Sequence, residues 1–288
     1  MDQLFAQFVK ERRFLKNVTS KTVVWYQTGF KAFMQLVPNA SPATINKQAL
    51  HTFIIGLRER GIAPVTCNTY AKAVNAFLKW LHDEGHVKTL FVIPPQRVER
   101  RILQVLTEPQ LRTLITFKPK TKNQQRVFTL ASLLVDTGIR IEEALTLRMA
   151  DIDLDNLLVK VRGKGRKERI VPFSPALRRV LFLWLKKRSD PMHSDWLFPT
   201  STGNRISVRN ACRAHHLFLD RLGLPRCGFH RLRHTFATSY LRNGGDVVRL
   251  SRVLGHSQIT TTMRYLHLQT EDLQRSHQQI SILERLSR

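Results

Sequence analysis

The chain has 288 residues, of which 42% are hydrophobic, so it is long enough to bury a sizeable core in one or two domains. Its 47 Lys and Arg outnumber its 21 Asp and Glu, and the net charge of +26 divides into +7 over residues 1–94 and +19 over residues 95–288. A basic excess in both halves indicates a polyanionic partner, DNA or RNA. It argues against a membrane surface, because the basic residues do not gather on one amphipathic helix.

Targeting and redox signals are absent from the same sequence. No apolar run approaches the roughly 18 residues that span a bilayer. The first residues lack a basic region followed by an apolar stretch, so we expect no signal peptide. The three cysteines are scattered and odd in number, which favours a reducing cytoplasm over a disulfide framework.

Residues 1–92 read as a small domain of four helices with apolar stripes at helical spacing. The expected helices run from Asp2 to about Arg13, from a cap at Thr19 or Ser20, from a cap at Ser41-Pro42 to Gly61, and from Pro64 onward. Residues 93–102, with two prolines followed by charges and no periodicity, predict a linker, either along phosphates or as a solvated hinge.

Residues 103–288 predict a second domain that begins with a capping box formed by Thr107 and Gln110. Helices are expected to about Leu147. Two β-branched runs, Leu157–Arg162 and Arg169–Phe173, then flank a Gly-containing turn and predict a β-hairpin. The remainder reads as helical, so the fold class is mainly α with a small antiparallel β-sheet.

Basic side chains of fixed charge mark the candidate site in this second domain. Arg140 follows a glycine at a helix start, with Glu143 one turn later to orient it. Arg233 lies three residues after His230, which places both on one helical face. Guanidinium groups grip two phosphate oxygens at once, and a histidine exchanges protons near neutral pH. A surface ion pair is the alternative reading for Arg140.

Lys164 sits at the tip of the basic turn of the hairpin. Neighbouring positive charges loosen the proton of a lysine, so Lys164 is a candidate donor to a leaving alkoxide. Simple phosphate binding by a basic turn is the alternative, above all for Arg166 and Lys167.

Tyr265 is the tyrosine with the most chemical context. The other three lie on apolar stripes or within a helix expected in the core, whereas Tyr265 follows polar residues nine positions after His256. A phenol has a pKa near 10, so it needs a base or nearby cations to attack a phosphodiester.

Metal binding is not expected. Cys227, His230 and His234 have a spacing that suggests zinc, but no fourth ligand follows at suitable spacing. The run Asp151-x-Asp153-x-Asp155 resembles the start of a calcium loop. Its sixth position, however, is Asn156 instead of glycine, and its twelfth is Arg162 instead of glutamate. No cofactor is expected.

Four segments in order resemble the tyrosine recombinase (phage integrase) family: TGIRIEEALTL, GKGRKERIVPF, HRLRHTFAT and LGHSQITTTMRY. They span residues 137–265, and the chain is similar to compact, Xer-like or transposon-resolvase-like members. The resemblance implies a helical core-binding (SAM-like) domain over 1–92, a linker over 93–102, and an α+β catalytic domain over 103–288.

The resemblance also implies a metal- and ATP-independent DNA strand transferase. Tyr265 would attack the scissile phosphate to give a 3′-phosphotyrosyl link, with Arg140 and Arg233 stabilising the five-coordinate phosphorus. Lys164 would protonate the 5′-oxygen. His230 would act as base for the tyrosine, and His256 would hydrogen-bond the phosphate.

The implied partners are double-stranded DNA and further copies of the chain, as a tetramer on two sites that passes through a Holliday junction. A second recombinase or a DNA-bending protein is a possible addition, and the C-terminal helix is expected to dock on a neighbour or in cis. The chain would act in the cytoplasm at the nucleoid. DNA contacts are expected at six basic residues: Lys72, Arg100, Arg101, Arg166, Arg209 and Arg213.

Two other functions stay open from the sequence. One is a topoisomerase-like enzyme that only nicks and reseals DNA, and the other is a non-catalytic DNA-binding regulator on the same fold. The regulator is disfavoured because the sequence has all six predicted catalytic residues: Arg140, Lys164, His230, Arg233, His256 and Tyr265.

Overall fold

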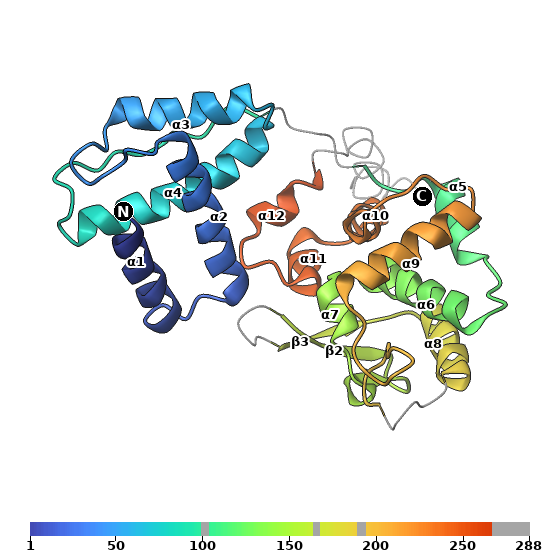
Figure 1. Cartoon of the computed structure of the whole chain (residues 1–288). Helices are drawn as coiled ribbons and strands as arrows, with labels where there is room; N and C mark the ends of the chain where they lie inside the picture. The colour runs from blue at the N-terminus through green and yellow to red at the C-terminus, as the bar shows by residue number, and fades with distance from the viewer. Residues whose placement is uncertain (99–103, 164–167, 189–193, 267–288) are drawn as a thin grey trace, which may run out of the picture. The chain divides into compact units, whose positions relative to one another are not determined.

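The computed structural model describes residues 1–98, 104–163, 168–188 and 194–266 (Figure 1). The chain divides into two compact units, Met1–Arg101 and Ile102–Arg288, and the division falls inside the predicted linker. Each unit has its own hydrophobic core.

The N-terminal unit consists of four helices around an aromatic core. They are α1 (Asp2–Phe14), α2 (Ser20–Leu36), α3 (Lys47–Glu59) and α4 (Pro64–Asp83). The Phe5 ring stacks on Phe30 at 3.9 Å between centroids, and Phe77 meets both edge-on. Helices α2 and α4 pack so closely that a Cβ at Gly29 would lie 2.5 Å from the Cβ of Ala73.

The predicted start of the third helix at Ser41-Pro42 is wrong. Residues 41–44 form a separate turn, in which the Thr44 backbone N–H donates to the Ser41 carbonyl at 3.0 Å. Helix α3 begins after Asn46, whose side chain accepts from the Ala49 backbone N–H at 3.0 Å. A sequence with two good caps five residues apart offers two starts, and the buried side chain of Ile45 between them selects the later one.

The first part of the predicted linker is held against α4. Asn75 exchanges two hydrogen bonds with the backbone of Ile93, both at 2.9 Å, and Asn68 does the same with Gln96 at 2.8 and 2.7 Å. Ile93 is buried. Residues 93–96 therefore extend the N-terminal unit and are not a solvated hinge.

The C-terminal unit is mostly helical with one small sheet (Figure 1). Its elements are α5 (Glu108–Ile115), α6 (Lys122–Thr137), α7 (Ile141–Leu145), a 3₁₀ turn (Met149–Asp151), β1 (Ile152–Asp153), β2 (Leu158–Arg162), β3 (Glu168–Pro172), α8 (Pro175–Lys187), α9 (Val208–Arg221), α10 (Phe229–Arg242), α11 (Val247–Leu254) and α12 (Thr260–Met263). The strands are antiparallel in the order β1-β2-β3. The predicted fold class is confirmed, as are the capping box at Thr107 and the hairpin.

The acidic run that resembles a calcium loop has a structural task. The Asp153 carboxylate accepts the backbone N–H groups of Asp155 and Asn156 at 3.1 and 2.9 Å and so closes the turn between β1 and β2. The two-residue strand β1 was not predicted, because it is too short to show an alternating pattern.

Helix α6 lies at the centre of this unit and packs against α8, α9 and α10. It ends at Gly138, whose backbone is left-handed with φ of 64°. A Cβ there would lie 2.2 Å from the Phe236 ring of α10, so both conformation and space require glycine. The end of α6 and the start of α7 are thereby fixed beside α10.

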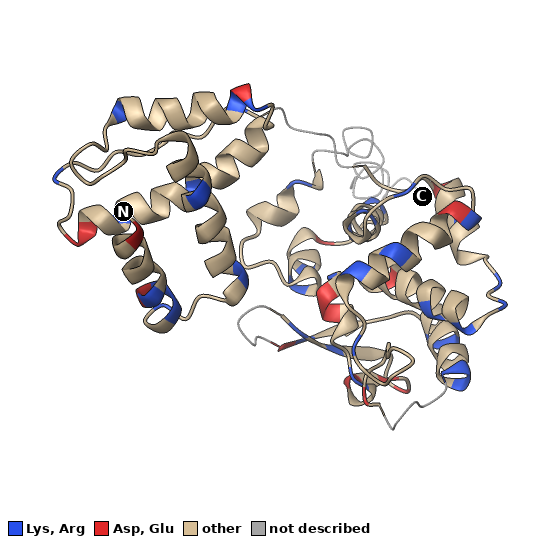
Figure 2. Ribbon diagram, viewed as in Figure 1, with Lys and Arg blue, Asp and Glu red and all other residues tan. Residues whose placement is uncertain are grey.

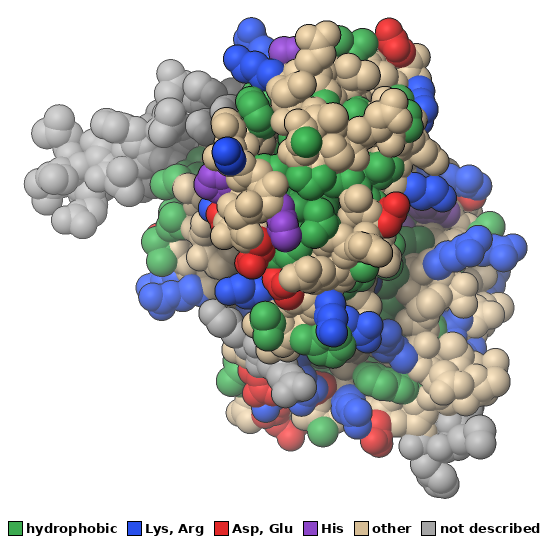
Figure 3. All heavy atoms as spheres, turned by 60° about the vertical axis from the view of Figure 1, so that its left-hand side comes forward, with side chains coloured by type: hydrophobic (Ala, Val, Ile, Leu, Met, Phe, Trp, Pro, Cys, Tyr) green, Lys and Arg blue, Asp and Glu red, His purple; other side chains and the backbone are tan. Residues whose placement is uncertain are grey.

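Lys and Arg occur on helices of each unit (Figure 2) and are spread over the visible face in Figure 3 instead of forming one patch. None of the described helices combines the length and apolarity needed to cross a bilayer.

His215 of α9 is a buried histidine that has no polar partner among the described residues. It is fully buried, its ring stacks on Phe229 at 4.5 Å, and within the described chain neither ring nitrogen has a hydrogen-bond partner. Burial, with a smaller effect of His216, lowers the pKa of His215 to about 4.

The unfolded chain therefore binds a proton at His215 more tightly than the folded chain does. We expect the stability contributed by neutral His215 to be complete above about pH 6.5 and to be lost as the pH falls toward 4, by about 2 kcal/mol at pH 5. Urea unfolding near pH 7.5 and near pH 5 measures the difference. His215→Leu should lose less stability on acidification than wild type, whereas His216→Leu next to it should behave as wild type. Equal losses in wild type and His215→Leu would contradict this expectation.

Candidate active site

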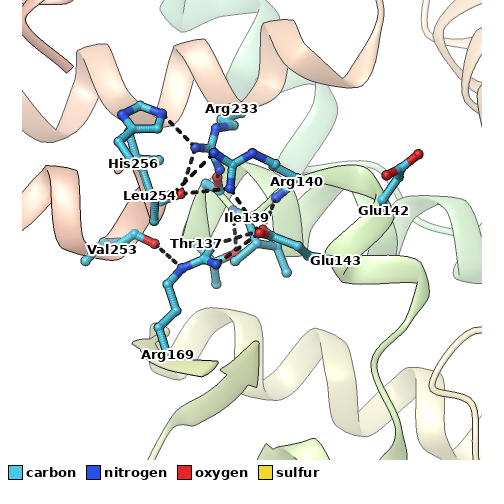
Figure 4. Close-up of polar contacts among 12 residues, drawn as sticks. Thr137, Ile139, Arg140, Glu142, Glu143, Arg169, Arg233, Val253, Leu254 and His256 are labelled. Carbon is cyan, nitrogen blue, oxygen red and sulfur yellow. Dashed lines mark hydrogen bonds and ion pairs between the residues drawn. The ribbon is translucent and has the colours of Figure 1, made fainter. Parts of the chain in front are cut away.

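The carboxyl end of α11 organises the candidate site (Figure 4). Gly255 ends the helix in the left-handed conformation and leaves the last carbonyl groups without helical partners. The Leu254 carbonyl accepts from Arg233 Nη2 at 2.8 Å and from Arg140 Nη1 at 3.3 Å, and the Val253 carbonyl accepts from Arg169 Nε at 2.8 Å. The negative end of a helix dipole favours such cations.

Glu143 of α7 supplies the matching negative charge. Its carboxylate receives Arg140 Nη1 at 3.0 Å and both terminal nitrogens of Arg169 at 3.0 and 2.8 Å (Figure 4). It also accepts the Arg140 backbone N–H at 2.7 Å, which caps α7. Burial by itself would raise the pKa of Glu143, but hydrogen bonds from Arg169 and Arg140 and their charges outweigh burial and lower it. The carboxylate therefore stays ionised.

Arg169 was not identified as a site residue from the sequence. It lies on the strand β3, opposite Val161 of β2 and two positions before the fully buried Val171. The period of two places Arg169 on the inward face of that strand, with 15% of its side chain exposed. The alternation of the strand is the signal that could have found Arg169, because an arginine on the inward face of a strand needs a buried acid, but no local pattern identifies that acid as Glu143.

Arg233 is the buried cation of the site, with 4% exposure. Besides the Leu254 carbonyl, its guanidinium donates to the Gly138 carbonyl at 2.7 Å. Burial, followed by the charge of Arg140, lowers the pKa of Arg233 to about 10, which leaves it charged at neutral pH. Arg140 keeps 38% of its side chain exposed, so the two predicted clamps differ in access.

His256 is neutral and its tautomer follows from its partners. Arg233 Nη2 lies 2.9 Å from His256 Nε2, and a guanidinium has donors only, so Nε2 accepts. His256 Nδ1 then carries the proton and donates to Thr262 Oγ1 at 2.8 Å. Burial, then the charges of Arg233 and Arg140, lower the pKa of His256 to about 4. The predicted bond from His256 to a phosphate stays a prediction, since Nε2 is engaged by Arg233 here.

Tyr265 lies close to this cluster. Its ring is buried, 4% exposed, in a small apolar cluster with Ala237 and Leu241 of α10 and Leu254 of α11. Burial raises the pKa of the Tyr265 phenol, and the charge of Arg233 partly offsets that rise. The phenol is therefore protonated at neutral pH and within the field of the buried arginine.

The histidine beside the phenol is His234, and not His230. His234 Nδ1 lies 2.8 Å from the Tyr265 hydroxyl, whereas the His230 side chain is exposed and its ring centroid is 6.3 Å from that of His234. The assignment of His230 as base stays a prediction without a contact to support it. The spacing of the sequence indicates for His234 only the role of a zinc ligand.

The remaining predicted residues fall into two groups. Lys164, Arg166, Arg100 and Arg101 lie outside the described residues, as does the predicted C-terminal helix. Lys72 on α4 and Arg209 and Arg213 on α9 are exposed. Their contacts with DNA stay predictions.

Chemically, the site combines the guanidinium groups of Arg140, Arg169 and Arg233, neutral imidazoles and a phenol. Fixed cations stabilise the charge of a five-coordinate phosphorus, and a phenol serves as nucleophile when a base accepts its proton. The arrangement suits attack of Tyr265 on a phosphodiester.

Comparisons with known proteins found similar sequences and similar folds. Residues 104–272 match the Phage integrase family. The tyrosine recombinase XerA of Thermococcus kodakarensis is 30% identical over 248 residues, covering 84% of each chain. The tyrosine recombinase XerC of Thermodesulfovibrio yellowstonii is 28% identical over 277 residues, covering 92% of each chain.

Solved structures share the fold. The XerH site-specific recombinase bound to palindromic difH substrate, in a post-cleavage complex, has a TM-score of 0.75 at 22% identity, covering 94% of this chain and 82% of that one. The Tn1549 transposon integrase in complex with transposon right end DNA has a TM-score of 0.77 at 19% identity, covering 96% and 98%.

Removing the charge of Glu143 tests the role of the carboxylate. In Glu143→Gln the guanidinium groups of Arg140 and Arg169 lose their common counter-charge in a buried setting, and we expect a loss of about 3 kcal/mol or more in the free energy of unfolding. Glu142→Gln is the matched control, because Glu142 is exposed and turned away from the cluster (Figure 4) and should cost less than about 0.5 kcal/mol. Urea unfolding of both variants measures this, and equal stability of the two would refute the role of Glu143.

Proposed function

The chain belongs to the phage integrase family, and from that premise we propose that it is a site-specific DNA recombinase that cleaves and rejoins duplex DNA through a phosphotyrosine. The observation that carries the proposal is that Arg140 and Arg233 both donate to the carbonyl of Leu254, whose side chain packs in the same apolar cluster as Tyr265.

In the proposed reaction, the scissile phosphate binds to Arg140 and Arg233, and the Tyr265 oxygen attacks phosphorus. The phenol proton passes to a neighbouring histidine. As the P–O5′ bond breaks, the 5′-oxygen takes a proton from Lys164, which leaves a 3′-phosphotyrosyl link. The free 5′-hydroxyl of a partner strand then attacks this link and releases Tyr265. The covalent link conserves the energy of the phosphodiester.

The substrate proposed for the chain is double-stranded DNA. The net charge of the protein, +26, supports this proposal, and so do the relatives solved with DNA, among them the XerH and Tn1549 complexes. Strand exchange between two sites calls for four copies of the chain, with a second recombinase or a DNA-bending protein as possible additions. We place this activity in the cytoplasm, at the nucleoid.

The proposed function is tested by trapping the covalent link. The protein is incubated in EDTA with fragmented genomic DNA from its source organism, denatured with detergent, and the DNA ends that remain attached are sequenced. Wild type should yield adducts at a defined sequence. Tyr265→Phe should yield none, since it keeps the ring and lacks the attacking oxygen.

The outcomes separate the candidate functions. A protein that binds the DNA without any adduct is a regulator on this fold, and the proposal is then wrong. If adducts form and DNA with two mapped sites yields recombinant product, the result supports recombination. If adducts form but plasmid DNA is only relaxed, without exchange between sites, the result supports a topoisomerase-like enzyme instead.

A further inference from the structure

One imidazole contacts the candidate nucleophile directly. His234 follows Arg233 on α10, and its Nδ1 lies 2.8 Å from the Tyr265 hydroxyl. The two rings are 5.7 Å apart between centroids and inclined by 53°, so they are tilted and not stacked, and the polar contact between them is the hydrogen bond. The bond joins residues 31 positions apart and attaches the segment after α12 to α10.

The direction of this bond follows from the needs of a buried hydroxyl. Tyr265 is 4% exposed, and the O–H of a buried phenol requires an acceptor. Within the described chain, His234 Nδ1 is the partner of the Tyr265 hydroxyl, so the phenol donates and Nδ1 accepts. The proton of the neutral imidazole is then on Nε2.

The surroundings keep His234 unprotonated. The titratable and charged groups that act on it are His230 and Arg233 on its own helix and the Tyr265 phenol from the facing segment, itself near Arg264. Burial first, then His230 and Arg233, lower the pKa of His234. The imidazole is neutral at physiological pH. The lone pair of its Nδ1 accepts the hydrogen bond from the phenol O–H.

We propose that His234 is the general base that accepts the proton of Tyr265 when the phenol attacks DNA. The inference rests on the proposed function and names a group for a step that the family resemblance assigns to His230. As the bond from Tyr265 Oη to phosphorus forms, the phenol O–H bond breaks and its proton moves to His234 Nδ1, giving an imidazolium. On rejoining, the P–Oη bond breaks and the proton returns to Oη.

The usual pKa values of the two groups set the timing of this transfer. A phenol near 10 and an imidazole near 6.5 leave the neutral pair favoured by roughly 3,000-fold, and burial of the phenol increases that ratio. The proton therefore moves while phosphorus bonds to the oxygen, and not beforehand. This keeps Tyr265 unreactive until a phosphate has arrived.

A structural role for His234 is the alternative, and two variants separate it from proton transfer. In His234→Asn the amide oxygen takes the place of Nδ1 as acceptor but cannot hold a proton near neutral pH. His234→Leu removes both properties. If His234 only positions the phenol, His234→Asn should cleave as wild type does. If His234 is the base, its loss should slow adduct formation by roughly 100-fold or more in both variants.

The experiment measures adduct formation on a nicked duplex carrying the mapped cleavage position. One version has the normal 5′-oxygen and the other a bridging 5′-sulfur, which leaves without a proton. We expect His234→Asn to be slow on both versions, because its defect is on the nucleophile side. Lys164→Ala should recover on the sulfur version. Wild type should show a rise in rate with pH that His234→Asn lacks and His230→Asn retains.

Several results would overturn the inference. They are a rate for His234→Asn within about threefold of wild type, full recovery of that variant on the 5′-sulfur duplex, or loss of the pH dependence in His230→Asn instead. Histidine ¹⁵N NMR of the whole protein gives a DNA-free readout: a proton on His234 Nδ1 at neutral pH also contradicts it. Circular dichroism and melting temperature establish that the variants fold. If wild type forms no adduct on any DNA, the proposed function itself has failed.

Discussion

The candidate site depends on how three like-charged guanidinium groups are held next to one another. Arg140, Arg169 and Arg233 would repel each other if they met in a buried setting without compensation. The carbonyl groups at the end of α11 and the carboxylate of Glu143 provide that compensation through short hydrogen bonds. The termination of one eight-residue helix at a glycine is therefore what allows the cations to converge.

The convergence of cations also sets the protonation state of the neighbouring histidines. Burial and positive charge keep His256 and His234 neutral, with pKa values below the ordinary value for histidine. A neutral imidazole can accept a hydrogen bond from Arg233, as His256 does, or from a phenol, as His234 does. The permanent charges are thus left to the arginines, and the exchangeable protons to the histidines and the tyrosine.

Much of the architecture was readable from local pattern. Thr107 with Gln110, Pro64 at a helix start and the alternating runs around residues 164–167 each carry their own signal within a few residues, and the elements formed where these signals stand. The local pattern predicts too early a start for the third helix, because Ser41 and Asn46 are both competent caps. The strand β1 was missed because two residues show no period.

The sequence by itself determined the family and the fold class, because four motifs in order are a property of the chain alone. It also predicted residues for the chemistry, since a phenol in a polar context is rare in this chain. Tertiary structure alone decided which partners meet. His230 and His234 are one helical turn apart and equivalent by spacing, and packing of the segment after α11 onto α10 brings Tyr265 to the second. Arg169 likewise became a site residue only when β3 faced Glu143, since a contact between residues distant in the chain is set by packing and not by local pattern.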